Sequence, residues 1–336
     1  MKLNEFSEKS LQAVETAIET SIQETVPSEY TGMREMIAYQ FGYDQPKTTR
    51  RTGKYIRPLL CLLTAAATGG QWESAVPAAA SLEMIHNFTL IHDDIEDKSD
   101  TRRGRPTTWK KFGVPLAINA GDALYALALV NLGQLDKYFP PEIEHKVAKV
   151  LHSTVLSLCG GQHLDIQFEE ASQLPLDSYW SMIAGKTGRL IIDSMQVGAI
   201  CSNSPEGTIS DVKKLGHYVG LGFQIQDDYL GIWGDTNATG KSITSDLTEG
   251  KKSFPIITGL QMKGRFAANY PNGKVDSVEI TAAIKSLELD GVNLLTQEQI
   301  KHTAMSAQSL LNKMDLKDPY KAMFRELIDL LIQRKA

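Results

Sequence analysis

Cysteine is scarce in this chain, which has three cysteines among its 336 residues. Cys61, Cys159 and Cys201 are far apart in the sequence and have apolar neighbours. This spacing argues against a disulfide framework and against a zinc site built from paired cysteines. We therefore expect three reduced cysteines in the core of a cytoplasmic protein.

The sequence also lacks an excess of positive charge and a long apolar run. Its net charge is −5, from 35 Lys and Arg against 40 Asp and Glu, which argues against a general nucleic-acid binder. The N-terminal residues contain no apolar stretch of the secretory type. No uninterrupted apolar run approaches the roughly 18 residues of a membrane span. We expect neither a nucleic-acid partner nor a membrane-spanning segment.

Strand patterns are nearly absent, because runs of β-branched residues that alternate with polar residues hardly occur. Apolar residues instead recur at spacings of three and four, as Leu11, Val14, Ile18 and Ile22 do, which is typical of amphipathic helices. Several later stretches are apolar on more than one face, like helices in the interior of a large bundle. The sequence predicts an all-α protein with a single domain over residues 1–336.

What the chain does contain is two pairs of aspartates inside apolar, helix-forming stretches. The first pair, Asp93 and Asp94, lies in the segment HDDIEDKSDTRRGRPT. In a helix, Asp93 and Asp97 project from one face about 5–6 Å apart. At an effective dielectric constant of about 20, two such charges repel by roughly 3 kcal/mol. A divalent cation would remove this repulsion, so we expect a metal site here.

The ligand types indicate which metal this is. Oxygen ligands without clustered histidine or cysteine favour magnesium, with manganese as the alternative, over zinc. Magnesium shares its coordination with phosphate oxygens, so the cluster also predicts a phosphorylated ligand. Taken alone, the motif is equally compatible with a solvated acidic turn. Arg102, Arg103 and Arg105 follow directly, and guanidinium groups beside carboxylates favour a metal–diphosphate complex.

A second acidic pair and several basic residues complete the pattern. Asp227 and Asp228 lie in QIQDDYLG, within a helix predicted over residues 211–233. Lys54 and Arg57, in GKYIRP, are three residues apart at a predicted helix start, where backbone N–H groups also favour an anion. Each basic motif taken singly is compatible with a solvated surface residue. Further polar residues lie within or just after apolar helices: His86, Lys186, Thr187 and Lys241.

Together these segments resemble the trans-isoprenyl diphosphate synthases, also called polyprenyl synthetases. The resemblance runs from Gly53 to Pro255 through GKYIRP, HDDIEDKSDTRRGRPT, GQHLD, KTG, QIQDDYLG and SDLTEGKKSFP, in this order. It implies an all-α bundle around a deep central cavity, in a homodimer. It also implies the condensation of isopentenyl diphosphate with an allylic diphosphate (dimethylallyl, geranyl or farnesyl diphosphate), with release of diphosphate.

The resemblance implies a role for each matching residue. The metal ligands would be Asp93, Asp94, Asp97, Asp227 and Asp228, holding about three magnesium ions around the allylic diphosphate. The allylic diphosphate would also contact Arg102, Lys186 and Lys241. Isopentenyl diphosphate would contact Lys54, Arg57, His86 and Arg103, while Thr187 and Gln224 would lie near the developing carbocation. The catalytic set would comprise Asp93, Asp94, Lys186, Thr187, Gln224, Asp227 and Lys241.

Two further features of the resemblance concern the product and the metal site. Phe88, Thr89 and Ile85, one to two turns before Asp93, would line the tunnel for the growing chain, with Phe88 as its floor; the alternative for Phe88 is ordinary core packing. The first acidic motif contains no insertion. This feature and the aromatic residue Phe88 both resemble the geranylgeranyl diphosphate synthases of the archaeal type. Many members carry a third aspartate where this chain has Gly231, which puts the exact third ligand in doubt.

Three alternatives stay open at this point. The product could be farnesyl diphosphate or a longer prenyl diphosphate. A class I terpene cyclase also ionises an allylic diphosphate with magnesium, but it needs only one diphosphate site. A non-catalytic partner subunit is the third alternative, although such subunits typically lose one acidic motif and this chain keeps both.

Overall fold

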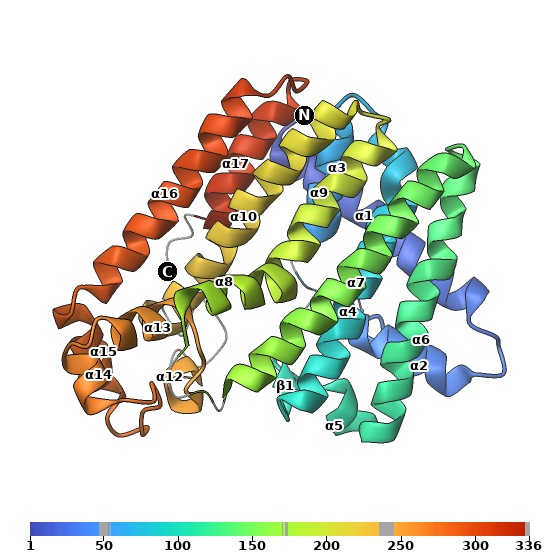
Figure 1. The fold of residues 1–336 in the computed structure, drawn as a ribbon. Coiled ribbons are helices and arrows are strands. Elements are labelled where there is room, and N and C mark those ends of the chain that lie inside the picture. Colours follow the sequence, from blue (N-terminus) through green and yellow to red (C-terminus); the bar gives the residue numbers. More distant parts are fainter. Residues whose placement is uncertain (47–52, 54, 170, 172–173, 235–244, 333–336) are drawn as a thin grey trace. The chain divides into compact units, whose positions relative to one another are not determined.

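The computed structural model describes residues 1–46, 53, 55–169, 171, 174–234 and 245–332 (Figure 1). Within these residues the only strands are β1 (Thr101–Arg102) and β2 (Arg105–Pro106), which pair antiparallel, and nearly everything else is helical. The predicted all-α fold is therefore confirmed. Lys54 and Lys241, which the sequence predicts to bind diphosphate, lie outside the described residues.

The helices fall into two runs along the chain. The first run comprises α1 (Leu3–Thr25), α2 (Thr31–Phe41), α3 (Ile56–Ala67), η1 (Trp72–Ala75), α4 (Val76–Glu96), α5 (Thr108–Phe112), α6 (Val114–Leu132), η2 (Gly133–Lys137) and α7 (Pro141–Glu169). The second comprises α8 (Leu176–Ile183), the π-helix η3 (Ala184–Gly188), α9 (Arg189–Cys201), α10 (Glu206–Trp233), α12 (Ser245–Glu249), α13 (Phe254–Gln261), α14 (Arg265–Asn269), α15 (Ile280–Leu289), α16 (Val292–Lys313) and α17 (Tyr320–Ile332).

The chain forms two compact units, each assembled from separate segments. Unit 1 comprises residues 1–155, 193–213 and 315–323, and unit 2 comprises residues 156–192, 214–314 and 324–336. The first acidic motif belongs to unit 1 and the second to unit 2. That the whole chain is one domain stays a prediction.

Helix α4 is the central element of unit 1. It packs against α1, α3 and α6, and small residues such as Ala78, Ala79 and Ala80 are fully buried on it. Pro77 lies in its first turn, where a proline costs no backbone hydrogen bond. The helix ends at Glu96, and the Asp97 N–H donates to the Asp93 carbonyl at 2.8 Å. The first acidic motif therefore occupies the last turn of a rigid core helix.

Helix α6 runs along α4 in unit 1 (Figure 1). The segment Val114–Lys137 is long and apolar enough to cross a membrane by length and composition, a test that the core helix of a soluble protein also passes. Ala120, Leu124 and Leu127 are buried on α6, whereas Leu116 and Val130 are exposed. One apolar face of α6 thus has no neighbour within the described residues.

A second core in unit 2 fixes the end of α10. Ile232 of α10 packs in one buried cluster with Leu247 of α12 and Ile256 of α13. This packing holds the segment 245–256 beside the second acidic motif and brings Asp246 and Phe254 close to it, as the contacts below show.

The three cysteines differ in their surroundings. Cys61 and Cys201 are buried free thiols, as expected, but Cys159 is exposed, so the prediction of three core cysteines was wrong for that residue. Cys159 lies on α7 beside Gly160 and Gly161, and its apolar sequence neighbours did not reveal which helix face it occupies.

Candidate functional site

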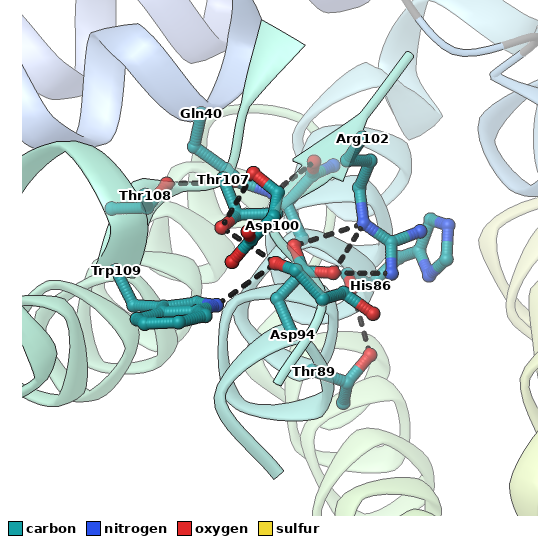
Figure 2. Close-up of polar contacts among 11 residues, drawn as sticks. Gln40, His86, Thr89, Asp94, Asp100, Arg102, Thr107, Thr108 and Trp109 are labelled. Carbon is teal, nitrogen blue, oxygen red and sulfur yellow. Dashed lines mark hydrogen bonds and ion pairs between the residues drawn. The ribbon is translucent and has the colours of Figure 1, made fainter. Parts of the chain in front are cut away.

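The acidic motif of α4 contains one buried carboxylate and two that are more open. Asp94 is 1 % exposed, and it accepts hydrogen bonds from Arg102 Nε at 2.9 Å and from Arg102 Nη2 at 2.7 Å (Figure 2). Such a bidentate pair is strong and fixes both groups. Asp93 is half-buried and Asp97 is exposed. Asp94 is therefore a fixed structural anion, and Asp93 and Asp97 are the carboxylates that a solvated cation can approach.

A tight hairpin after α4 positions the arginines. Its turn uses Arg103 and Gly104, both with left-handed backbone angles (φ of 55° and 74°). The Thr107 hydroxyl and the Trp109 indole N–H both donate to the Ser99 carbonyl, at 2.8 and 3.0 Å (Figure 2). These bonds close the loop, so that Arg102 is directed to Asp94 and Arg103 projects from the turn.

Arg103 lies against the segment that precedes α3. A Cβ atom at Gly53 would lie 2.5 Å from Arg103 Nη2, so the guanidinium of Arg103 lies directly against the backbone of Gly53. Tyr55, the residue before α3, has a left-handed backbone (φ of 45°), which is unusual for an aromatic residue. Arg57 lies in the first turn of α3, directly after Tyr55 and Ile56. The guanidiniums of Arg57 and Arg103 both interact electrostatically with Glu83 and His86.

His86 and Glu83, one turn apart on α4, lie next to these two arginines. Burial and the guanidiniums of Arg57 and Arg103 lower the pKa of His86 well below its usual range, so the imidazole is neutral at physiological pH. Burial raises the pKa of Glu83 from 4.5 to about 7, against the opposing effect of the two guanidiniums. The predicted isopentenyl diphosphate residues Arg57, His86 and Arg103 are thus brought together in unit 1.

The acidic motif of α10 repeats the division into buried and open carboxylates. Asp228 is 3 % exposed and accepts three hydrogen bonds: from the Tyr179 hydroxyl at 2.6 Å, the Gln224 amide at 2.8 Å and the Phe254 backbone N–H at 2.8 Å. Asp227 is exposed. Gln224, which is predicted to lie near the carbocation, therefore donates its amide N–H to Asp228. Of the two carboxylates, that of Asp227 is the more accessible.

Lys186 is held in unit 2 by an ion pair with Asp165 of α7. It lies with Thr187 in the π-helix η3, where one extra residue widens the helical turn. A Cβ atom at Gly161 would lie 2.2 Å from the Lys186 backbone nitrogen, so η3 touches the backbone of α7 at a glycine. Lys186, a polar residue within an apolar helical stretch, thus lies in a π-helical turn and contacts a carboxylate.

Asp246 of α12 lies over Gly231 of α10. A Cβ atom at Gly231 would be 2.7 Å from an Asp246 carboxylate oxygen. Lys251 Nζ lies 3.8 Å from the other Asp246 oxygen, and the carboxylates of Asp246, Asp228 and Asp165 raise the lysine's pKa. The carboxylate of Asp246 therefore occupies the space beside position 231, for which the family resemblance implies a third aspartate.

The predicted chain-length residues have distinct surroundings on α4. Ile85 is fully buried, and Phe88 is 7 % exposed. The Phe88 ring packs on Tyr125 of α6, with ring centroids 5.1 Å apart, and edge-on against His92 at 5.7 Å. The Thr89 hydroxyl donates to the His86 carbonyl of its own helix at 2.8 Å. Phe88 and Tyr125 together form an aromatic pair one turn before the acidic motif.

Five residues of these clusters were not assigned a role from the sequence: Glu83, Asp165, Tyr179, Asp246 and Lys251. Asp165, Asp246 and Lys251 lie inside segments that carry the family resemblance, so their position was a usable signal. Glu83 is the one acidic residue in the apolar run of residues 75–91, and an unexplained charge there was a second signal. Tyr179 lies 49 residues from Asp228, and no local pattern links the two.

We expect Tyr179→Phe to destabilise the protein, because it removes one of three donors to a buried carboxylate. The loss should be about 1–3 kcal/mol in the free energy of unfolding. Burial raises the pKa of Asp228 from 3.8 to about 6, and the Tyr179 hydroxyl opposes that rise. Stability from a raised carboxyl pKa is present at low pH and is lost as pH rises through about 6, so the variant should lose more at pH 8 than at pH 5.

Urea denaturation at the two pH values measures this difference. Tyr138→Phe is the matched control, because Tyr138 is 54 % exposed. An equal and small loss in both variants at both pH values would show that the Tyr179 bond contributes nothing.

Within the described residues, no three His, Cys, Asp or Glu side chains are placed to hold a metal ion by themselves. A hard cation at these carboxylates would therefore need ligand oxygens from elsewhere, and magnesium commonly takes them from phosphate groups and water. The oxygen-only donor set fits magnesium, and it does not fit zinc.

Comparisons with known proteins give a consistent result. The sequence pattern of the polyprenyl synthetase family matches residues 46–287. A geranylgeranyl diphosphate synthase of Mycobacterium tuberculosis is 38 % identical over 70 % of this chain and 68 % of its own length. A (2E,6E)-farnesyl diphosphate synthase of Mycobacterium bovis is 30 % identical over 90 % of this chain and 87 % of its own length.

A similar solved structure is that of geranylgeranyl pyrophosphate synthase from Corynebacterium glutamicum complexed with isoprenyl diphosphate and magnesium. It has a TM-score of 0.85 and 26 % sequence identity, with all of both chains covered.

Proposed function

Since the chain belongs to the polyprenyl synthetase family, we propose that it condenses isopentenyl diphosphate with an allylic diphosphate and that its main product is all-trans geranylgeranyl diphosphate. The reaction is a prenyl transfer: the allylic carbon–oxygen bond breaks, diphosphate leaves, and the double bond of isopentenyl diphosphate attacks the allylic carbon. Farnesyl diphosphate is the alternative product, which the farnesyl synthase relative supports.

One observation carries this proposal: each acidic motif has a buried aspartate clamped by protein donors and a more open one beside it. Asp94 is held by Arg102, and Asp228 by Tyr179, Gln224 and Phe254. A carboxylate with its lone pairs engaged in this way is a poor metal ligand and a good structural anchor. We therefore assign metal binding to Asp93, Asp97 and Asp227, and positioning to Asp94 and Asp228.

The metal assignment rests on the chemistry of these donors. Magnesium, when bound there, would stabilise the negative charge that develops on the departing diphosphate. The relative from Corynebacterium glutamicum is described with isoprenyl diphosphate and magnesium together, which supports the same pairing here. Because the protein offers few oxygens at each motif, the diphosphate itself would complete the coordination.

The basic residues divide between two diphosphates in this proposal. Lys186 would exchange its ion pair with Asp165 for the allylic diphosphate, and Arg102 would contact that diphosphate while it stays on Asp94. Arg57 and Arg103, with neutral His86 as a hydrogen-bond donor, would hold isopentenyl diphosphate. By family resemblance, Lys241 would join the first group and Lys54 the second. A second diphosphate site favours condensation over terpene cyclisation.

The remaining residues would shield the allylic cation from water and stabilise its positive charge. An allylic cation reacts with any water that reaches it, so the site has to exclude water. The buried side chains of α4, Ile85 and Phe88 among them, supply an apolar wall beside the acidic motif. Thr187 and Gln224 would present oxygen atoms to the developing positive charge, and the departing diphosphate would accept the final proton.

Two further proposals concern the setting of the enzyme. Leu116, Ile118 and Val130 of α6 are exposed apolar side chains, and a second copy of the chain would cover them in a homodimer. The three free thiols suit a reducing compartment, which supports a cytoplasmic location.

Product analysis tests the function directly. The full chain with magnesium and isopentenyl diphosphate should give geranylgeranyl diphosphate from dimethylallyl, geranyl and farnesyl diphosphate alike, read by mass spectrometry. A chelator should abolish turnover, and added magnesium should restore it. Hydrocarbon formed from geranylgeranyl diphosphate alone would favour the cyclase, and a purified chain that makes no product would favour the partner subunit.

A further inference from the structure

Glu83 is a buried carboxyl group that the condensation reaction does not use. It is 3 % exposed on α4, one turn before His86. Its Oε1 accepts a hydrogen bond from the Asn87 amide at 2.9 Å. Its Oε2 is also buried and has no hydrogen-bond partner in the part of the chain that the structure describes. An anion half-satisfied in this way is costly unless nearby positive charge or a proton compensates it.

Positive charge is present on two sides of this carboxyl group. Arg57 reaches it from the first turn of α3, and Arg103 from the turn of the hairpin. Both guanidiniums interact with Glu83 electrostatically. In the part of the chain that the structure describes, the polar groups near Glu83 include Tyr55 before α3 and His86 and Asn87 on α4. Tyr43, Glu15 and Glu19 lie beyond Tyr55, and Gln40 lies beyond Asn87.

Of the titratable groups named here, Glu83 is the one whose protonation state can change when a ligand binds Arg57 and Arg103. His86 is neutral at physiological pH, and burial raises the pKa of Tyr55 far above that range. Both therefore keep the same charge near neutral pH. Glu83 changes its charge there, because its pKa is about 7.

We propose that Glu83 is a positioning residue of the isopentenyl diphosphate site: it is the buried counter-charge of Arg57 and Arg103, and it takes up a proton when the diphosphate binds them. The inference rests on the proposed function, because the diphosphate is the ligand that this function assigns to the two arginines. Without ligand, the carboxylate keeps two neighbouring cations together. With ligand, the diphosphate supplies that negative charge, and the neutral acid no longer repels it.

The sign of the pH dependence follows from this linkage. A bound anion raises the pKa of Glu83 above its ligand-free value of about 7. Below pH 7 the group is protonated in both states and does not affect binding. Above pH 7 the free protein has to take up a proton, so the affinity due to this group falls by up to about tenfold per pH unit until the pKa of the complex is reached.

Isothermal titration calorimetry with isopentenyl diphosphate measures the proton directly. Binding to the full chain is recorded at pH 8.0 in two buffers of different ionisation enthalpy, for the parent and for Glu83→Gln. The glutamine keeps the acceptor for Asn87 and cannot titrate. We expect the parent to take up more protons than the variant, by up to about one per site. The titration of the ligand's own diphosphate is common to both proteins and cancels in the difference.

Affinity across pH gives a second readout. Glu83→Gln should bind isopentenyl diphosphate about tenfold more tightly than the parent at pH 8 and equally at pH 6. The KM for the allylic diphosphate should not change, because that ligand is assigned to other residues. Equal proton uptake, or a variant that binds more weakly at both pH values, would overturn the inference.

Two further variants separate this role from a structural one. Ser81→Ala removes a buried hydrogen bond of the same helix, from the Ser81 hydroxyl to the Ala128 carbonyl, and should lower the melting temperature without changing proton uptake. If Glu83→Gln does not fold, Asn87→Ala replaces it. Loss of the Asn87 bond raises the pKa of Glu83, so the fall in affinity should begin at higher pH than in the parent. An unshifted profile would contradict the inference.

Turnover of the parent keeps the two proposals apart. A parent that makes prenyl diphosphates but shows no difference in proton uptake from Glu83→Gln contradicts only the role of Glu83. A parent that makes no prenyl product contradicts the proposed function itself.

Discussion

Asp93→Asn and Asp227→Asn are each expected to reduce kcat by about two to three orders of magnitude, because each removes a charged ligand from the group that stabilises the departing diphosphate. Both side chains are more open than their buried neighbours Asp94 and Asp228. The free energy of unfolding should therefore change by no more than about 0.5 kcal/mol. Steady-state kinetics at saturating magnesium, together with urea denaturation of each variant, measure the two effects separately.

The matched control is Asp136→Asn, which removes an exposed carboxylate from the short helix η2, away from both acidic motifs. Its kcat should equal that of the parent. If either motif variant folded normally and kept near-parental turnover, the assignment of the metal ligands would fail. Partial recovery at raised magnesium concentration would further support a ligand role, because weaker binding can be offset by mass action.

Phe88→Ala is expected to shift the product to longer prenyl chains by at least one isoprene unit. The side chain is 7 % exposed, and its ring packs against Tyr125 one turn before the acidic motif. Removing the ring opens space in the direction in which the chain is predicted to grow. The free energy of unfolding should also fall by about 3–5 kcal/mol, the usual cost of a buried Phe→Ala change. Assays therefore have to be run well below the melting temperature of the variant.

Chromatography of dephosphorylated products reads out the change in length. Leu82→Ala is the control, because Leu82 is fully buried on α4 and lies six residues from Phe88, on another face of the helix. It should destabilise the protein without altering the product. Tyr125 remains as a second barrier in Phe88→Ala, so the double variant Phe88→Ala/Tyr125→Ala should lengthen the product further. Identical products from parent and Phe88→Ala would reduce Phe88 to ordinary core packing.

The fold class and the acidic motifs could be predicted from the sequence because both depend on short-range patterns. Helical periodicity identifies α1 and α4. An aspartate pair such as Asp93 and Asp94 in an apolar stretch is costly to bury, and the arginines that follow it favour a ligand as the compensation. The polar residues Lys186 and Thr187 within an apolar helix were also visible locally, whereas the π-helical turn that contains them was not predicted. These signals required no knowledge of which helices touch.

The division of labour inside each motif could not be predicted, since it depends on contacts between distant segments. Nothing local distinguishes Asp94 from Asp93 before the hairpin brings Arg102 back, eight residues later in the chain. Asp228 is clamped by Tyr179 and Phe254, which are 49 and 26 residues away. A helical pattern gives the face of a residue only approximately, and the partner on that face is set by tertiary packing.

Gly231 limits how this enzyme can be redesigned. A carboxylate oxygen of Asp246 already stands 2.7 Å from where the first side-chain carbon would be. A side chain introduced at position 231 would therefore need the carboxylate of Asp246 to move, either by a change of its rotamer or by a second substitution on α12.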